Sequence, residues 1–425
     1  MCHRRLCTHR QYVTTGVMMR PLERLQLRSN LQQLYKSNDL IMRFMLINVC
    51  TGTWVGMVNF IIPVFALSLG ASSFEIGLVR GLSGVGDLLL VLPAGLLIDY
   101  FGSRKMYLAS CAVGGAITIL LALAWTPWAL IVMMIFYGMA RSIRTTSLNA
   151  SFFQHMNTIG AGKGGWYKGS MTVGAQFLGS LIGGALAVAV SFAGYFVTAS
   201  MFLLAPILVA LGGKSELMIP ASRKKRGLKG SVDGYRHLLR DRILVSATIT
   251  ECINTAFAIT FSTFVAVMVI TSLGLSIAMA ALLISLRGLA NIVVVFFGGR
   301  LLELNHYRLY VASFIFSAAG LLLLGTSKDV WLLMLASVIL GLFSGVMTLV
   351  TFTQVGSTEG EKGKVSGIFS FGQKAGMVAG PVLGGIVGSF TGLQAIFLCF
   401  IPFFLLMAAY NLLEGRNTRN ISGAA

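Results

Sequence analysis

Seven charged side chains lie inside otherwise apolar stretches of this chain, where a charge is costly and usually serves a function. An unpaired cation in a low-dielectric interior needs a partner, and an anionic ligand can supply one. The seven comprise five cations and two anions: Arg80, Arg141, Arg144, Arg287 and Lys374 against Asp87 and Glu251. The excess of positive charge predicts a buried site for a small anion.

Two of these arginines, Arg80 and Arg287, begin the same Arg-Gly-Leu triplet at places 207 residues apart. A guanidinium binds an acidic group through two parallel hydrogen bonds, which makes arginine hard to replace at such a site. We therefore expect the pair to clamp one anion across a central cavity. Some arginines could instead bond backbone carbonyls or, for Arg144, reach an interface with water. The other residues expected to bind the anion are Arg141, Lys374, Gln373 and Asn254.

The two buried carboxylates offer a second chemistry. Asp87 follows Arg80 by two helical turns on the same helix face, but at about 10 Å the two are too far apart for a direct pair. Glu251 is followed one turn later by Asn254. Because buried carboxyl groups serve as proton relays in membranes, Asp87 and Glu251 are candidates for coupling a proton to another process.

The stretches that hold these residues have the composition of membrane spans. Of all residues 56% are hydrophobic and 11% are charged, and the mean hydropathy is +0.81, whereas soluble domains carry about 25% charged residues. A helix needs about 20 apolar residues to cross a bilayer. Twelve such spans are expected, near 43–69, 74–98, 106–125, 128–150, 168–190, 192–211, 243–271, 276–299, 308–326, 330–352, 365–388 and 393–412.

The net charge of +19 is concentrated on one set of connections. Lys and Arg crowd the residues before the first span, the connection from Lys214 to Arg242 and alternate short loops, whereas the opposite loops hold only Lys328. Basic loops identify the cytoplasmic side of a membrane protein. Both termini are therefore expected to be cytoplasmic, and the basic residues are expected to contact anionic lipid headgroups in place of nucleic acid.

The long basic connection divides the chain into two halves that repeat. Three positions recur 204 residues later: Gly95, Asp99 and Arg104 as Gly299, Glu303 and Arg308. We expect a leader (1–42), a six-helix bundle (43–211), a basic linker (212–242), a second six-helix bundle (243–412) and a tail (413–425).

A loop between the second and third spans gives the most specific resemblance. Its frame, Gly95-x-x-x-Asp99-x-x-Gly102-x-Arg104-Lys105, resembles the signature of the major facilitator superfamily. The resemblance implies an all-α integral membrane protein of two six-helix bundles related by pseudo-two-fold symmetry. It also implies a secondary transporter working by alternating access, most often as a monomer. In the family the aspartate that corresponds to Asp99 faces the start of helix eleven. The dipole of that helix stabilises a carboxylate by about 0.3–1 kcal/mol. The gating residues are then Gly95, Asp99, Gly102, Arg104, Lys105 and, in the second half, Glu303.

Small residues at helical spacing mark the fifth and eleventh spans. Such stripes let membrane helices approach closely, and we expect helix five to pack on helix eight and helix eleven on helix two. The fifth-span stripe also resembles a motif of drug/proton antiporters in the superfamily, with Ser180 in place of their proline. The packing residues are Gly174, Gly179, Gly183, Gly184, Gly376, Gly380, Pro381 and Gly384.

These patterns favour a transporter over an enzyme. The sequence has no Walker, zinc-protease or serine-hydrolase motif, so an ATP-driven pump or a membrane hydrolase is unsupported. No metal or cofactor is expected. We expect a transporter of a small, anionic solute in a bacterial inner membrane. The alternatives are a proton-coupled exporter of drugs or metabolites and a transporter-shaped sensor without turnover.

Overall fold

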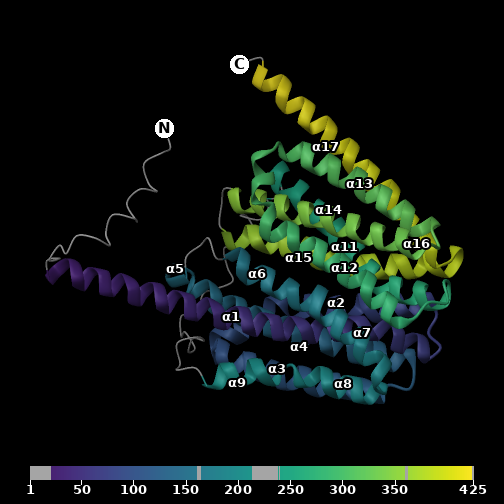
Figure 1. The fold of residues 1–425 in the computed structure, drawn as a ribbon, viewed down its shortest axis with the longest axis horizontal. Coiled ribbons are helices and arrows are strands. Elements are labelled where there is room, and N and C mark those ends of the chain that lie inside the picture. Colours follow the sequence, from purple (N-terminus) through teal and green to yellow (C-terminus); the bar gives the residue numbers. More distant parts are fainter. Residues whose placement is uncertain (1–20, 160–163, 213–237, 239, 359–361, 424–425) are drawn as a thin grey trace.

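Helices make up nearly all of the chain that the computed structural model describes. The described residues are 21–159, 164–212, 238, 240–358 and 362–423, and no strand occurs among them. Of residues 21–37, 91, 92, 99, 157, 164, 357, 362–364 and 416–423 only the backbone is described. The helices lie side by side along the length of the molecule, with the first half below and the second above in Figure 1.

The first half is built from six long helical units, some of them made of consecutive pieces. α1 (Pro21–Ser68) begins well before the first predicted span and projects from the bundle at its N-terminal end (Figure 1). A π-helical turn at Val173–Leu178 divides the fifth unit, and such turns often mark functional sites. The other helices are α2 (Ser73–Phe101), α3 (Ser103–Leu120), α4 (Pro127–Gln154), α5 (Met156–Ile159), α6 (Gly164–Thr172), α7 (Gly179–Ala189), α8 (Phe192–Met201) and α9 (Leu204–Gly212).

The second half repeats this plan with fewer interruptions. A 3-10 turn at Gly298–Glu303 follows its second helix, at the place where the first half has the signature loop. The helices are α11 (Arg242–Thr271), α12 (Ile277–Phe297), α13 (His306–Thr326), α14 (Val330–Ser357), α15 (Lys362–Thr391), α16 (Leu393–Leu398) and α17 (Phe400–Gly423).

Nine helical segments of the described chain are long and apolar enough to cross a membrane. The other three predicted spans coincide with α2, α4 and α15. These helices carry charged residues where the two halves meet. These three helices have 29, 28 and 30 residues, which at 1.5 Å per residue is enough to cross a hydrocarbon core about 30 Å thick.

Polar side chains fix the ends of several helices. At the start of α2 the Ser72 hydroxyl accepts from the Glu75 backbone N–H, and the Glu75 carboxylate accepts from the Ser72 backbone N–H. This reciprocal pair satisfies two donors that the helix leaves free. The turn between α2 and α3 requires Gly102, because its φ of 85° lies in the left-handed region that favours glycine.

Glycines bring helices of the same half into backbone contact. A Cβ atom added at Gly376 or Gly380 of α15 would lie 2.1 or 2.3 Å from backbone oxygens of α11. One added at Gly174 or Gly179 would lie 2.3 or 2.5 Å from backbone atoms of α1. Much of each predicted stripe therefore faces the first helix of its own half.

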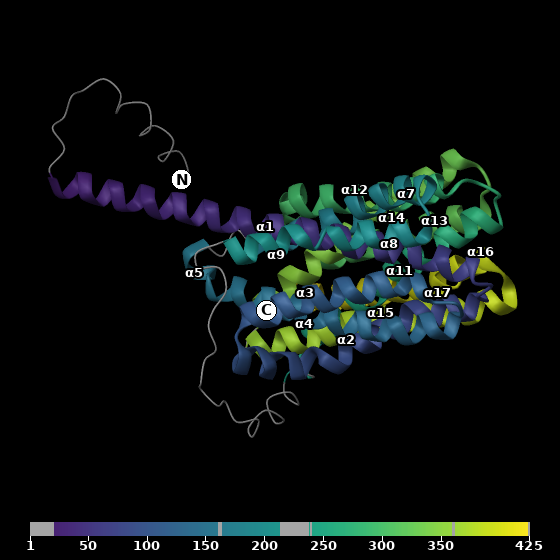
Figure 2. The same ribbon diagram turned by 90° about the horizontal axis from the view of Figure 1, so that it is seen from below.

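Two further helix pairs join the halves, and Figure 2 shows them on opposite edges of the molecule. α7 lies beside α12, where a Cβ atom at Gly184 would lie 2.1 Å from that of Ala281. α15 lies beside α2, where a Cβ atom at Gly77 would lie 2.4 Å from the Pro381 carbonyl oxygen. These are the predicted pairs five with eight and eleven with two. Both contacts lie toward the same end of the bundle, near the loops that precede α2 and α12.

Candidate functional site

A cavity of about 880 Å³ lies between the two halves, away from these glycine contacts. Its walls come from α1, α2, α4 and α6 of the first half and from α15 of the second. Arg144, Lys168 and Lys374 line it, and no carboxylate is among the described residues that do so. A cavity of this size suits a small organic molecule, and its lining carries positive charge only.

Arg144, on α4, is a buried cation without a hydrogen-bond acceptor among the described residues. It is 2% exposed, so it does not extend to the membrane interface. Its guanidinium lies 4.9 Å from the ring of Trp54, and none of its three nitrogens has a hydrogen-bond acceptor among the described residues. Leaving buried donors unpaired is costly. All three nitrogens are buried, so a ligand with acceptor oxygens in the cavity would satisfy them only after a shift of the Arg144 side chain.

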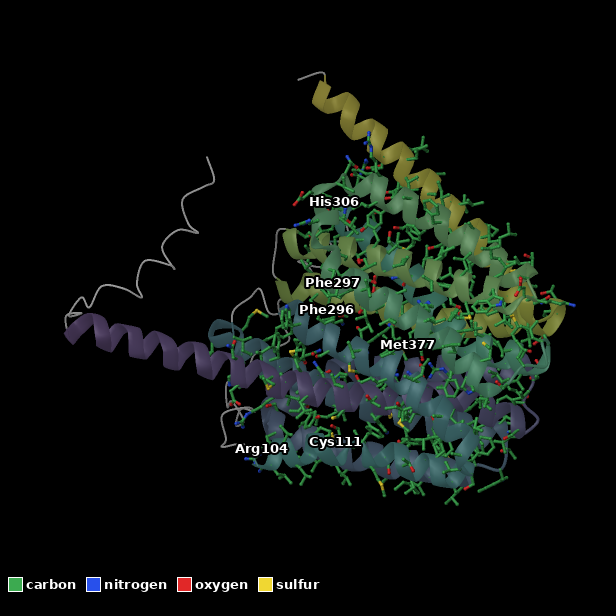
Figure 3. The ribbon with its side chains drawn as sticks, viewed as in Figure 1. Arg104, Cys111, Phe296, Phe297, His306 and Met377 are labelled. Atoms are coloured by element: carbon green, nitrogen blue, oxygen red, sulfur yellow. The ribbon has the colours of Figure 1, made fainter. Side chains whose placement is uncertain are left out.

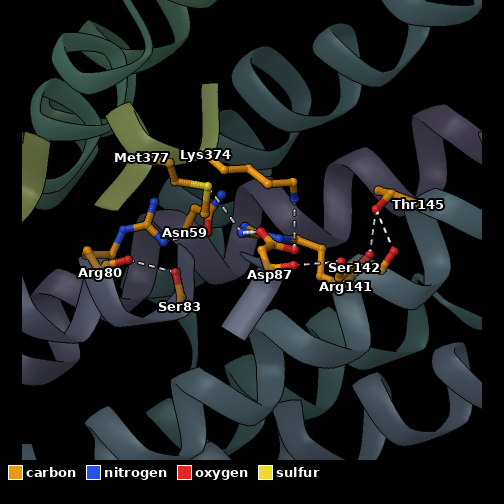
Figure 4. Close-up of polar contacts among 9 residues, drawn as sticks. All are labelled: Asn59, Arg80, Ser83, Asp87, Arg141, Ser142, Thr145, Lys374 and Met377. Carbon is orange, nitrogen blue, oxygen red and sulfur yellow. Dashed lines mark hydrogen bonds and ion pairs between the residues drawn. The ribbon is translucent and has the colours of Figure 1, made fainter. Parts of the chain in front are cut away.

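Asp87 stands between cations from two helices (Figure 4). Its carboxylate contacts the Arg141 guanidinium of α4, and its other oxygen lies 3.7 Å from the Lys374 Nζ of α15. Arg141 also donates to the sulfur of Met377, 3.4 Å away, which lies where the two halves meet (Figure 3). Because Lys374 and Met377 belong to the second half, this cluster connects the halves and leaves one positive charge in excess.

Glu251, on α11, is held by neutral donors. The Gln373 amide donates to one carboxylate oxygen at 2.8 Å, and the Thr351 hydroxyl donates to the other at 3.2 Å. Gln373 also lines the cavity. Since Gln373 and Lys374 are consecutive, one turn of α15 connects the cavity to both Glu251 and Asp87.

Arg80 is fully buried and bridges the halves outside the cavity lining. Its Nη1 donates to the Asn59 side-chain oxygen at 2.6 Å, and its Nε donates to the Thr263 hydroxyl of α11 at 3.3 Å. Its Nη2 has no acceptor among the described residues. The bond to α11 places Arg80 in the contact between the halves, one turn of α2 after Gly77.

Arg287 lies inside the second half, where its guanidinium contacts the rings of Phe257 and Phe261 at 5.3 and 5.1 Å. Its Nη2 donates to the Ser344 hydroxyl at 3.4 Å, and this hydroxyl donates to the Asn254 side-chain oxygen at 2.7 Å. The cation–π contacts and this polar network hold most of the Arg287 guanidinium, and its Nε has no acceptor among the described residues. Asn254 belongs to the same network, outside the described cavity lining.

The expected clamp is therefore absent from this conformation, since neither Arg80 nor Arg287 is among the described residues that line the cavity. Matching places in two repeated halves share a depth in the membrane, but they need not face a common space. Each guanidinium instead contacts side chains of its own neighbouring helices.

The structure describes only some of the side chains in the loop between α2 and α3, which carries the family signature. The backbone of Asp99 lies near the end of α2, and its side chain lies outside them. Arg104 donates to the Leu211 carbonyl oxygen of α9 at 3.2 Å, within the first half, and Lys105 and Glu303 are exposed. The gating role of this loop stays a prediction.

Lys168 is not among the residues that the sequence predicts to bind a ligand, although it begins the predicted fifth span. Helix α6 begins at Gly164 and carries Lys168 into the cavity wall, where its Nζ lies 5.3 Å from the Phe352 ring of the second half. Lys168 also lies near enough to Glu251 for their opposite charges to attract each other. The helical spacing from Lys168 to the glycine stripe was the available signal, because it continues one helix across the predicted boundary.

Comparisons with known sequences agree on the family. The model of the Major Facilitator Superfamily matches residues 44–302 and again 247–422. The multidrug resistance protein MdtG of Escherichia fergusonii is 23% identical over 402 residues, which are 88% of this chain and 94% of that protein. MdtD of Cronobacter sakazakii, also named for multidrug resistance, is 29% identical over 145 residues; the match spans 32% of this chain and only 31% of MdtD.

Solved transporter structures share the fold. A bacterial homologue of the human lysosomal transporter Spinster, inward-facing and unoccupied, has a TM-score of 0.72 at 13% identity, covering 89% of this chain and 97% of that one. The human organic anion transporter MFSD10 has a TM-score of 0.64 at 14% identity, covering 88% and 99%. The repeated six-helix halves, the cavity between them and the family match over both halves agree: the chain belongs to the major facilitator superfamily and is a multi-pass membrane transporter, not an enzyme.

Proposed function

We propose that the protein is a secondary active transporter that moves a small organic anion by alternating access. The observation that carries this proposal is Arg144, a buried guanidinium without a hydrogen-bond acceptor among the described residues, in the wall of a cavity between the halves. Such a charge destabilises a protein unless something neutralises it. An acidic ligand group would do so, with the option of two parallel hydrogen bonds.

The rest of the cavity favours the same ligand charge. Lys168 and Lys374 add two cations, and the described lining contains no acidic residue. The lining also includes Leu88, Ile368 and Phe371, apolar side chains that a bare inorganic ion would leave without contact. These features together support an organic anion.

Alternating access requires halves that can rock about a site between them. The close glycine contacts near one end of the bundle and the cavity away from them are consistent with this motion. If the basic loops are cytoplasmic, the conformation faces inward, like that of the Spinster homologue. We further propose a monomer in the bacterial inner membrane with both termini cytoplasmic.

A second candidate is proton-coupled efflux of drugs or amphipathic metabolites. Two relatives are named for multidrug resistance, and Asp87 and Glu251 are buried carboxylates beside the cavity that could carry a proton. In that case the cations would hold these carboxylates rather than bind a substrate.

Transport by purified protein in liposomes separates the two. Uptake of radiolabelled organic anions should exceed that in protein-free liposomes, while a cationic dye should not move. A contradiction would be dye transport driven by a pH gradient with no anion flux. Anion binding without any flux would point to a sensor.

A further inference from the structure

The charges around the cavity do not balance, even with both neighbouring carboxylates ionised. Arg144, Lys168 and Lys374 line it, and Arg141 stands behind the lining. Among the described residues, the neighbouring carboxylates are Asp87 and Glu251. Four positive and two negative charges leave an excess of two. Because Lys168 is exposed and Lys374 is only partly buried, this excess acts mainly by attracting anions into the cavity.

The cations that line the cavity come from three different helices. Arg144 extends from α4 and rests on Trp54 of the same half. Lys374 extends from α15 of the second half toward Asp87. Lys168 extends from α6 and covers Phe352 of the second half. The positive charge is therefore distributed around the cavity, with Met171 and Phe371 among the apolar lining residues.

We propose that the substrate is an organic dianion whose two acid groups are separated by an apolar spacer. This proposal rests on the proposed anion transport and makes the substrate class specific. One acid group binds Arg144, the other binds Lys168 and Lys374, and the spacer contacts the apolar lining. A monoanion would neutralise only one of the two excess charges, and a single phosphate group would place both of its charges at one end of the molecule, whereas the cations that line the cavity come from three helices.

The test compares acids that share a carbon skeleton and differ in charge. Uptake into liposomes is measured for adipate against hexanoate, for succinate against butyrate and for glycerol 3-phosphate, at pH 7.5 where every carboxyl group is ionised. The dicarboxylate of a pair should be taken up at least about tenfold better, equivalent to 1.4 kcal/mol. Equal uptake of the monocarboxylates, or a preference for glycerol 3-phosphate over both dicarboxylates, would overturn the dianion assignment.

A charge-removing variant tests the same assignment within one protein. Lys168→Gln should lower the ratio of adipate to hexanoate uptake about tenfold, because the site then needs one negative charge less, while Lys168→Arg should keep the ratio. Lys328→Gln removes a cation from an exposed loop and serves as the matched control. An unchanged ratio in Lys168→Gln, in protein with normal thermal stability, would contradict the proposal.

The two proposals fail in different ways. Transport of monocarboxylates and dicarboxylates alike leaves anion transport in place and removes only the dianion. Movement of a cationic dye without any anion flux removes both.

Discussion

At the scale of single residues, the partner of each buried cation decides its role. Arg141 has a carboxylate, Arg287 has two aromatic rings, and Arg80 has neutral acceptors. Arg144 alone among them has only the face of Trp54 and a cavity beside it. Cation–π contact offsets about 0.5–2 kcal/mol, less than the cost of a buried unpaired charge. The remaining cost makes Arg144 the residue most in need of a ligand.

The Asp87 cluster gives a prediction about stability. Asp87→Asn should destabilise the protein by about 3–5 kcal/mol, because it leaves Arg141 and Lys374 buried without a carboxylate. Lys374→Gln should cost much less, since Arg141 still pairs with Asp87. Thermal unfolding of both variants in detergent measures the order, and equal loss in the two would show that the cluster is not a shared ion pair.

Arg287 gives a prediction about affinity. Arg287→Lys should lower thermal stability, because lysine lacks the planar guanidinium that contacts the Phe257 and Phe261 rings. The apparent KM for the transported anion should stay within about twofold, a change well under 1.4 kcal/mol, since Arg287 does not line the described cavity. A large rise in KM with unchanged stability would contradict this prediction and support the hypothesis that Arg287 and Arg80 clamp one anion.

Sequence reasoning could identify these charged residues but not the directions they face. A charge in an apolar span is visible in the sequence, and so all seven were found. Whether its side chain meets a cavity or a neighbouring helix depends on rotation about the helix axis and on partners hundreds of residues away. Asn254 and Lys168 illustrate this: in this conformation the first lies in a polar network inside its half, and the second lines the cavity.

At the scale of helices, α15 connects the site to the contact between the halves. Its first part carries Gln373 and Lys374 into the cavity, and its later part packs Pro381 against Gly77 of α2. Spacing in the sequence predicted close approach to helix two. It could not predict that Gly376 and Gly380 face α11, because glycine spacing defines a stripe without naming its neighbour.

A glycine variant tests whether this helix crossing closes one end of the protein. Gly77→Ala places a Cβ atom 2.4 Å from the Pro381 carbonyl oxygen, so the halves must separate there. A cysteine placed at buried Ser83, in a background whose native cysteines are replaced by serine, should then react faster with a membrane-impermeant reagent. Gly165→Ala has no heavy atom within 4 Å of the added Cβ and serves as the control. Equal reaction rates in both variants would show that the crossing does not control access.

At the scale of the whole molecule, the two-fold repeat was the most predictable feature. Twelve apolar stretches and marks 204 residues apart implied two six-helix halves, and the family match and the fold confirm the class. The conformation could not be predicted, because a chain that adopts several conformations has the same sequence in each of them. The beginning of α1 at Pro21 was also missed, since no apolar span extends that far.

The orientation of the molecule is open to a direct labelling experiment. The basic loops predict that a cysteine at Ser327, in the short loop between α13 and α14, reacts with an impermeant reagent from outside intact cells. A cysteine at Ser231, in the basic linker outside the described residues, should react only after the membrane is opened. The reverse pattern would place the basic loops outside and make the cavity outward-facing.

The proposed anion transport depends most on the unpaired guanidinium of Arg144. The most direct measurement pairs anion uptake with thermal stability in the native protein, Arg144→Lys, Arg144→Gln and the exposed control Lys328→Gln. Arg144→Gln should lose at least about tenfold in apparent affinity, because a hydrogen bond to a charged group contributes roughly 1.5–3 kcal/mol. Its unfolding temperature without substrate should stay the same or rise, since a buried unpaired charge is gone. Arg144→Lys should retain part of the affinity. A lower unfolding temperature with unchanged anion affinity in Arg144→Gln would contradict the account, because Arg144 would then be a structural residue.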